Sequence, residues 1–156
     1  MKATVVAEFC LIHFFQKQII MKRFINTIHE VDAPADKVWS RIAQGDGVES
    51  WIPIIKSSKI ENGNRRLCEM HEGGSLEETF LISEAKRTFM YSIDKQEAFP
   101  ATGIVGTIRI ESVDDNRSRL FWDLELEVES ADTFAELKPQ IVEIYSRSAA
   151  QLSQVA

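Results

Sequence analysis

Two kinds of residue are scarce in this chain of 156 residues, and each scarcity excludes a class of protein. With only two cysteines, Cys10 and Cys68, the chain has no disulfide framework of the kind that holds small secreted proteins together. The reducing cytoplasm is therefore the simpler location. Lysine and arginine number 18 against 24 aspartate and glutamate residues, which gives a net charge of −6. Because nucleic-acid binding depends on neutralised phosphates, no nucleic-acid partner is expected.

The chain also lacks an apolar run of the length, about 20 residues, that a membrane-spanning helix needs. Residues 3–15 are apolar except for Glu8 and His13. This run resembles the core of a signal peptide, but no small-residue cleavage site follows it. We interpret residues 1–20 as an N-terminal extension, with Met21 as a second candidate start, and expect no stable membrane insertion. A membrane or secretion anchor and an additional helix of the fold are the alternatives.

The composition of the chain is that of a globular protein, and we expect one domain over residues 21–156. Apolar residues make up 44% of the chain and charged residues 27%, which excludes wholesale disorder. A domain of this length buries enough surface to form a core without disulfides or metals.

Alternation of apolar and polar residues predicts seven strands in this domain. They cover residues 22–32, 54–61, 65–72, 75–84, 87–94, 103–113 and 118–129. Turn residues such as Asn62-Gly63 and Gly73-Gly74 separate the last six strands. Strands joined by such short turns must be antiparallel.

Two short helices are predicted after the first strand, and a long helix at the end of the chain. Pro34 is well placed to begin the first helix. The long helix should begin near residue 132 or 133 and end near 153, with Thr133 and Glu136 as a capping box. Pro139 should kink this helix or mark a later start. The helix carries an apolar stripe that suits it to cover the sheet, which predicts an α+β fold.

This order of elements resembles the helix-grip fold, in which a curved antiparallel sheet wraps around a long C-terminal helix. Residues 31–39 (VDAPADKVW) are similar to an opening motif of the SRPBCC superfamily. That superfamily includes START-domain proteins, the birch pollen allergen and polyketide cyclase/dehydrase-like proteins. Residues 51–53 (WIP), 77–82 (EETFLI) and 87–91 (RTFMY) resemble motifs of the cyclase-like branch. The resemblance covers residues 22–155 and implies a seven-stranded helix-grip domain.

The same stretches are distantly similar to the plant abscisic-acid receptors. The receptor lysine that binds the ligand's carboxylate corresponds to Ile52 here. The receptors' gate and latch loops correspond to residues 72–75 and 97–99, which have other sequences. A hormone receptor of that kind is therefore not expected.

Two polar side chains fall on apolar faces of the predicted strands. Glu78 shares its face with Leu76 and Phe80. It either anchors a ligand in an apolar pocket, or is solvated at the rim or paired with a nearby Lys or Arg, since burying a lone charge is costly. Tyr91 shares its face with Phe89. It is either the ligand's hydrogen-bond donor or a core residue bonded to the protein.

Other candidates leave similar alternatives. Lys56 either neutralises an acidic head group or extends from the rim of the sheet. Gly106 leaves space beside the long helix, which suits a cavity or close packing. Phe99 lies on a loop that overhangs the pocket mouth in the superfamily. In the last strand, alternation faces Glu127 away from the core, whereas alignment with the receptors faces it inward. We favour the alternation, because exposing five apolar residues is costly.

The sequence therefore favours a binding module for a hydrophobic small molecule, such as a lipid, polyketide, isoprenoid or aromatic compound, between the sheet and the long helix. The alternatives are a polyketide cyclase/dehydrase-type enzyme with Glu78 or Tyr91 as general acid or base, and an interaction domain with a filled cavity. No cofactor or metal is expected, since Cys68 and His71 fall on opposite faces of a strand. The candidate binding residues are Lys56, Met70, Leu76, Glu78, Phe80, Phe89, Tyr91, Phe99, Ile104, Gly106, Ile108, Ile144 and Ser148.

Overall fold

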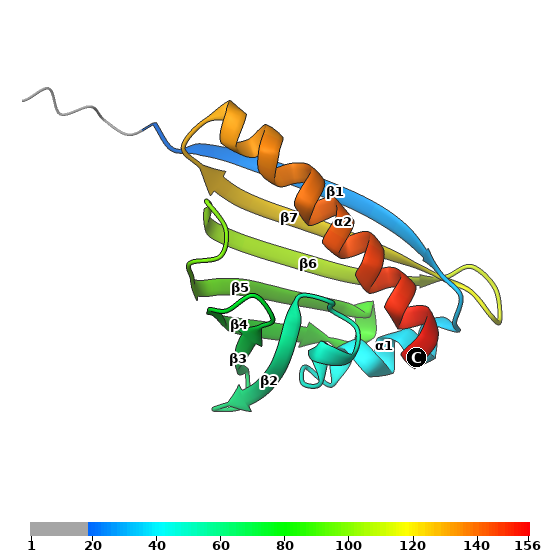
Figure 1. Ribbon diagram of the computed structural model, residues 1–156. Helices are drawn as coiled ribbons and strands as arrows, with labels where there is room; N and C mark the ends of the chain where they lie inside the picture. The colour runs from blue at the N-terminus through cyan, green and yellow to red at the C-terminus, as the bar shows by residue number, and fades with distance from the viewer. Residues whose placement is uncertain (1–18) are drawn as a thin grey trace, which may run out of the picture.

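A computed structural model describes residues 19–156, in which an antiparallel sheet wraps around a long helix (Figure 1). In chain order the elements are β1 (Met21–Val31), α1 (Ala35–Ala43), the 3-10 turn η1 (Val48–Ser50), β2 (Ile55–Glu61), β3 (Arg65–Met70), β4 (Ser75–Ser83), the 3-10 turn η2 (Glu84–Lys86), β5 (Thr88–Gln96), β6 (Thr102–Ser112), β7 (Ser118–Val128) and α2 (Ala131–Val155). The predicted α+β helix-grip fold is confirmed. The predicted strand ends agree with the observed ones to within two residues.

In the sheet, the first strand of the chain pairs with the last, and β1 and β2 form the two edges. Its order is β1-β7-β6-β5-β4-β3-β2. From β2 to β7, each strand pairs with the next in the sequence, and all these pairs are antiparallel. β1 instead pairs with β7, from Met21 opposite Val128 to Val31 opposite Ser118. This pairing joins the first strand of the domain to the last, and α2 follows β7 in the chain.

Alternation along β7 determines which side chains face the core. Leu120, Leu124 and Leu126 on this strand are all buried, whereas Asp123 between them is exposed. Glu127 has the parity of Asp123 and lies on the outer face, with its carboxyl carbon 3.1 Å from the point where a Cβ on Gly103 would lie. The alternation was therefore the correct guide, and Glu127 does not face the core.

Helix α2 packs on the inner face of the sheet against β1 and β7, and its C-terminal end lies near α1 (Figure 1). It begins at Ala131 because the Oγ of Ser130 accepts a hydrogen bond from the backbone N–H of Thr133 at 3.0 Å. The predicted cap at Thr133 is therefore wrong. Pro139 lies inside the helix and does not mark its start. The buried face of α2 consists of Leu137, Ile141, Tyr145, Ser148, Ala149 and Leu152.

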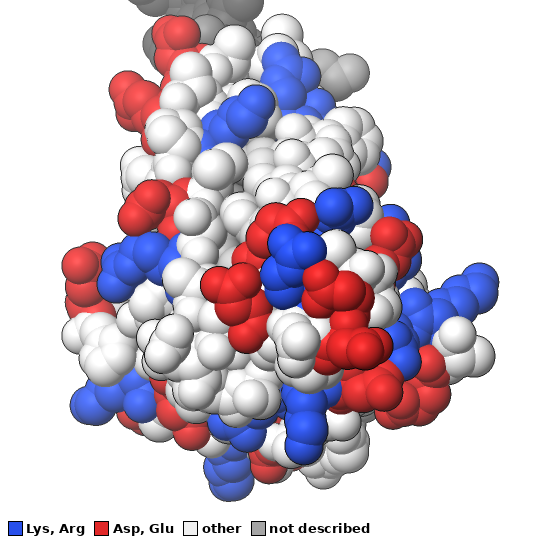
Figure 2. Space-filling model, turned by 90° about the vertical axis from the view of Figure 1, so that its right-hand side faces the viewer, with Lys and Arg blue, Asp and Glu red and all other residues white. Residues whose placement is uncertain are grey.

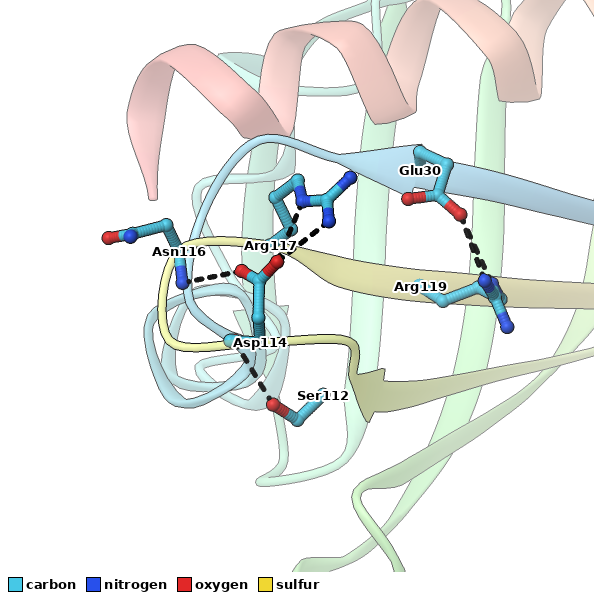
Figure 3. A network of polar contacts seen from close by, with 6 residues as sticks. All are labelled: Glu30, Ser112, Asp114, Asn116, Arg117 and Arg119. Carbon is cyan, nitrogen blue, oxygen red and sulfur yellow. Dashed lines mark hydrogen bonds and ion pairs between the residues drawn. The ribbon is translucent and has the colours of Figure 1, made fainter.

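A polar network centred on Asp114 holds the turn between β6 and β7 (Figure 3). The Asp114 carboxylate accepts hydrogen bonds from the backbone N–H of Asn116 at 2.9 Å and from the Nη2 of Arg117 at 2.7 Å. These two contacts lower the pKa of Asp114. Nearby, Arg119 on β7 pairs with Glu30 on β1 at 3.1 Å. The network lies on the surface, so it orders the turn more than it stabilises the fold.

The surface at this end of the molecule carries charges of both signs. Figure 2 shows acidic and basic side chains interspersed over that face, without a broad basic area. A groove for nucleic acid needs a continuous basic surface. Within residues 19–156, no helix is both long enough and apolar enough to cross a membrane.

The predicted extension, residues 1–20, lies outside the described residues except for Ile19 and Ile20. Both of these are exposed. Cys10 falls in the part that is not described, and Cys68 is a free, buried cysteine. The boundary at residue 21 coincides with the start of β1. The division into an extension and one domain, residues 21–156, stays a prediction.

Two leucines test which face of the sheet forms the core. Leu126→Ala should lower the free energy of unfolding by about 2–5 kcal/mol, because this side chain on β7 is fully buried. Leu81→Ala on β4, where the side chain is 60% exposed, should change it by less than about 0.5 kcal/mol. Urea denaturation measures both variants, and equal losses would contradict this assignment of the core.

Candidate functional site

A cavity lies between the inner face of the sheet and α2, and apolar side chains from both form most of its wall. The volume of the cavity, measured as the space open to the centre of a water-sized sphere, is about 80 Å³. This is enough for several water-sized groups. Eight of the residues predicted to bind a ligand line this cavity: Leu76, Glu78, Phe89, Tyr91, Phe99, Ile104, Ile108 and Ile144. Their contact with a ligand stays a prediction.

One part of the cavity wall is only half-buried and marks its opening. The half-buried lining residues are Ile52, Ile54, Ile93, Phe99 and Ile144. Gln96 holds the loop between β5 and β6 at this opening, because its Nε2 donates to the backbone oxygens of Phe99 and Ala101 at 3.1 and 2.8 Å. The position expected for Phe99, at the mouth of the pocket, agrees with this arrangement.

A buried ion pair joins β3 to β4 in the cavity wall. The Nε of Arg66 donates to the Oε2 of Glu78 at 2.8 Å, and the two side chains are 5% and 7% exposed. The Nη1 of Arg66 also donates to the backbone oxygen of Gly45 at 2.6 Å. The guanidinium carbon lies 5.5 Å from the ring centre of Phe89, within range of a cation–π interaction. Glu78 is therefore not solvated at the rim: it faces the cavity and is paired with an arginine.

Cys68 lies beside this ion pair and is chemically inert. Its Sγ donates to the Oε2 of Glu78 at 3.5 Å. Burial, together with the charge of Glu78, raises the pKa of Cys68 to about 12. The side chain stays a thiol at neutral pH, whereas nucleophilic attack and metal binding require the thiolate. In the described part of the chain, no group of three His, Cys, Asp or Glu side chains could hold a metal ion.

Two tyrosines connect the sheet to α2 in the wall of the cavity. The hydroxyl oxygens of Tyr91 on β5 and Tyr145 on α2 lie 3.3 Å apart. The Nε1 of Trp122 donates to the hydroxyl oxygen of Tyr91 at 2.9 Å. The Trp122 ring also stacks on Tyr145, with ring centres 3.8 Å apart. Tyr91 is therefore bonded to the protein, as one of the two interpretations expected, while it remains part of the cavity wall.

Burial keeps both tyrosines neutral. It raises the pKa of Tyr91 to about 12 and the pKa of Tyr145 well above its usual value. The nearby charge of Glu78 acts in the same direction on both groups. At neutral pH these phenols can therefore donate hydrogen bonds to a molecule in the cavity, but they do not ionise there.

Two predicted binding residues, Lys56 and Met70, do not line the cavity. A bulge between Ile55 and Ser57 shifts the register of β2 against β3. The bulge breaks the alternation at Lys56, whose side chain is exposed, as the alternative at the rim of the sheet expects. Met70, at the end of β3, is partly buried and packs against the core.

Three further predicted residues, Phe80, Gly106 and Ser148, are buried but also lie outside the cavity wall. Phe80 stacks on Phe89, with ring centres 5.1 Å apart. A Cβ on Gly106 would lie 2.0 Å from the ring of Tyr91. The glycine therefore serves close packing and does not enlarge the cavity. The Oγ of Ser148 donates within α2 to a backbone oxygen one turn earlier, at 2.8 Å.

Sequence analysis missed several cavity residues, among them Arg66, Trp51, Trp122 and Tyr145. Tyr145 belongs to the apolar stripe predicted for the long helix, but nothing in that stripe indicates a partner for its hydroxyl group. The opposite charges of Arg66 and Glu78 are a signal in the sequence, but the register that sets them opposite each other does not follow from a two-residue turn at Gly73-Gly74. Opposite charges on facing strands attract each other.

Comparison with known proteins assigns the chain to a family. The family model described as polyketide cyclase / dehydrase and lipid transport matches residues 23–156. The chain belongs to this family. No curated protein matches the chain.

Solved structures share the fold of this family member. XoxI from Bacillus cereus is 27% identical, with a TM-score of 0.74 over 84% of this chain and 93% of that one. A START superfamily protein from Mycobacterium smegmatis is 16% identical, with a TM-score of 0.70 over 85% and 99%. The aromatase/cyclase Zhui from a Streptomyces species is 17% identical, with a TM-score of 0.63 over 86% and 91%. At these identities the last two show a common fold only.

The ionisation of the two tyrosines tests their burial. Tyr91 and Tyr145 are the only tyrosines in the chain. The near-ultraviolet absorbance of tyrosinate should therefore rise in the native protein only as the pH approaches about 12, and near pH 10 in urea, at about the pKa of a free tyrosine. Between about pH 10 and 12 the native protein keeps protons that the unfolded chain releases, so stability is full below this window and falls as the pH rises through it. A native titration centred near pH 10 would contradict the burial of both groups.

The ion pair can be tested against an exposed neighbour on the same two strands. Arg66→Met leaves the buried charge of Glu78 without a partner and should cost about 3–5 kcal/mol of unfolding free energy. The double variant Arg66→Met/Glu78→Leu should recover most of this loss. Arg65→Met removes the exposed pair with Glu77, 3.3 Å apart, and should cost at most about 1 kcal/mol. Urea denaturation distinguishes these cases, and a double variant as unstable as Arg66→Met would argue against a buried pair.

Proposed function

We propose that this protein binds a hydrophobic small molecule in the cavity between the sheet and α2. The observation that carries this proposal is an apolar cavity into which a few polar groups converge, from Arg66, Glu78, Tyr91 and Tyr145. Small-molecule sites usually have this form. The apolar wall would supply affinity, at about 25 cal/mol for each Å² of apolar surface removed from water, and the polar groups would orient the ligand.

The ligand would be a lipid, polyketide, isoprenoid or aromatic compound. The description of the family, which names both polyketide cyclase / dehydrase and lipid transport, supports this range. The cavity offers about 80 Å³ to the centre of a water-sized sphere. This volume favours a compact molecule or one that displaces lining side chains. We place the protein in the cytoplasm because it has few cysteines.

Binding is better supported than catalysis or protein interaction. A cyclase or dehydrase would need Glu78 or Tyr91 to accept or supply a proton. The Oε2 of Glu78 already accepts hydrogen bonds from Arg66 and Cys68. The pKa of Tyr91 is about 12. At neutral pH its hydroxyl group is therefore protonated, so it cannot act as a base, and it is too weak an acid to release its proton readily. An interaction domain would have its cavity filled by side chains, whereas this cavity has open space.

Titration with N-phenyl-1-naphthylamine, a neutral dye that fluoresces more strongly in apolar surroundings, tests the proposal. The wild-type protein should bind the dye saturably. Ile104→Phe adds a ring at a cavity-lining position of β6 and should weaken binding by about tenfold or more, since part of the dye's site is then occupied. Val105→Phe, the same change at the next residue, which is 46% exposed on the outer face, should leave binding unchanged.

Two controls accompany this titration. Circular dichroism and urea denaturation show whether both variants fold. Ile104 borders the open space of the cavity, so the Ile104→Phe variant is expected to fold. Absence of saturable binding to the wild-type protein, or equal binding by the two variants, would refute ligand binding in this cavity.

A further inference from the structure

The hydroxyl groups of Tyr91 and Tyr145 carry one hydrogen more than their surroundings accept. Each phenol has one hydrogen. The two oxygens are 3.3 Å apart, and one of the two hydrogens forms the bond between them. Trp122 donates to Tyr91 and so does not provide an acceptor. Among residues 19–156, no other acceptor is hydrogen-bonded to either hydroxyl group, which leaves one phenolic hydrogen unused.

This surplus does not depend on which tyrosine donates. If Tyr91 donates to Tyr145, the hydrogen of Tyr145 is unused, and in the opposite case the hydrogen of Tyr91 is unused. Both side chains line the cavity, and they are 8% and 6% exposed. A buried donor without an acceptor is costly. An acceptor atom on a molecule in the cavity removes this cost.

The charges of the cavity cancel each other. Arg66 and Glu78 are the charged residues in its wall, and they are paired with each other at 2.8 Å. An anionic ligand would have to compete with Glu78 for the guanidinium group, and success would leave a buried carboxylate without its partner. A cationic ligand would compete with Arg66 in the same way. The wall therefore favours an uncharged ligand.

We propose that the cavity selects uncharged, mainly apolar molecules that carry an acceptor oxygen, such as a carbonyl oxygen, which accepts the unused hydrogen of the Tyr91–Tyr145 pair. This inference rests on the proposed function, the binding of a hydrophobic small molecule in the same cavity. The ring of Trp122, stacked on Tyr145 beside the hydroxyl pair, offers apolar surface next to the donor.

Indane and 1-indanone test the proposal, because they share a ring system and differ by one carbonyl oxygen. Each competes with N-phenyl-1-naphthylamine for the wild-type protein. The ketone should bind about two- to tenfold more tightly, the range expected for one net hydrogen bond. In Tyr91→Phe/Tyr145→Phe, which lacks both phenolic hydrogens, the ratio of the two affinities should fall towards one, and the Nε1–H of Trp122, which loses its acceptor in this variant, is the donor that remains beside the cavity.

Two further variants separate the hydrogen bond from a change in shape. Tyr145→Phe should keep the preference for the ketone, because the remaining hydroxyl of Tyr91 still has its hydrogen. Ile108→Val alters the cavity wall without touching a donor, so it should change both affinities together and leave their ratio unchanged. Infrared spectroscopy provides a second readout. The carbonyl band of bound 1-indanone should lie at lower wavenumber than in hexane, and should return towards the hexane value in Tyr91→Phe/Tyr145→Phe.

The outcomes distinguish this inference from the proposed function. Equal affinity of the wild-type protein for indane and 1-indanone would overturn the inference and leave hydrophobic binding intact. A preference that is undiminished after the loss of both hydroxyl groups would overturn the assignment to the tyrosine pair. Tighter binding of indane-1-carboxylate than of 1-indanone would overturn the selection of uncharged ligands. Failure of the dye to bind the wild-type protein would overturn both proposals.

Discussion

A single long helix packs on the inner face of a seven-stranded sheet, and the difference in width between them shapes the rest of the molecule. A helix with its side chains is about 10–12 Å across, whereas seven strands at a spacing of about 4.8 Å extend over about 30 Å. Helix α2 packs against β1 and β7. The strands further from it curve around the space that remains, and the cavity forms there. Three of its polar side chains, Arg66, Glu78 and Tyr91, belong to these strands, β3, β4 and β5.

The same geometry explains how polar side chains are tolerated in the wall. Arg66 and Glu78 face each other across adjacent strands. Each therefore replaces the water that the other charge loses on burial. Tyr91 and Tyr145 instead meet across the gap between the sheet and the helix. One pair is thus complete within the sheet, while the other has a donor left for whatever occupies the gap. This difference separates the structural part of the cavity from the part that we assign to recognition.

Alternation predicted the inner faces of β4 to β7 correctly, because within an unbroken strand the parity of a residue determines its face. It failed where the strand or its loop is irregular. The bulge in β2 interrupts the alternation at Lys56, a candidate binding residue whose side chain is exposed. A two-residue turn at Gly73-Gly74 would pair residue 72 with residue 75. The last pair observed is instead Glu69 with Ser75, so the loop is longer than expected. The register that results brings Arg66 opposite Glu78. At Gly106 the sequence showed a missing side chain but not that the ring of Tyr91 fills the space.

The pairing of β1 with β7 has a consequence for synthesis on the ribosome, where the chain emerges from its N-terminus. β2 to β7 can each pair with a neighbour soon after it emerges, because their partners are adjacent in the sequence. β1 emerges before all of them, yet its partner ends at Val128 and its covering helix follows that residue. Contacts between distant segments also form slowly. The apolar residues of β1, such as Ile25, therefore stay without their native neighbours until nearly the whole domain has been made.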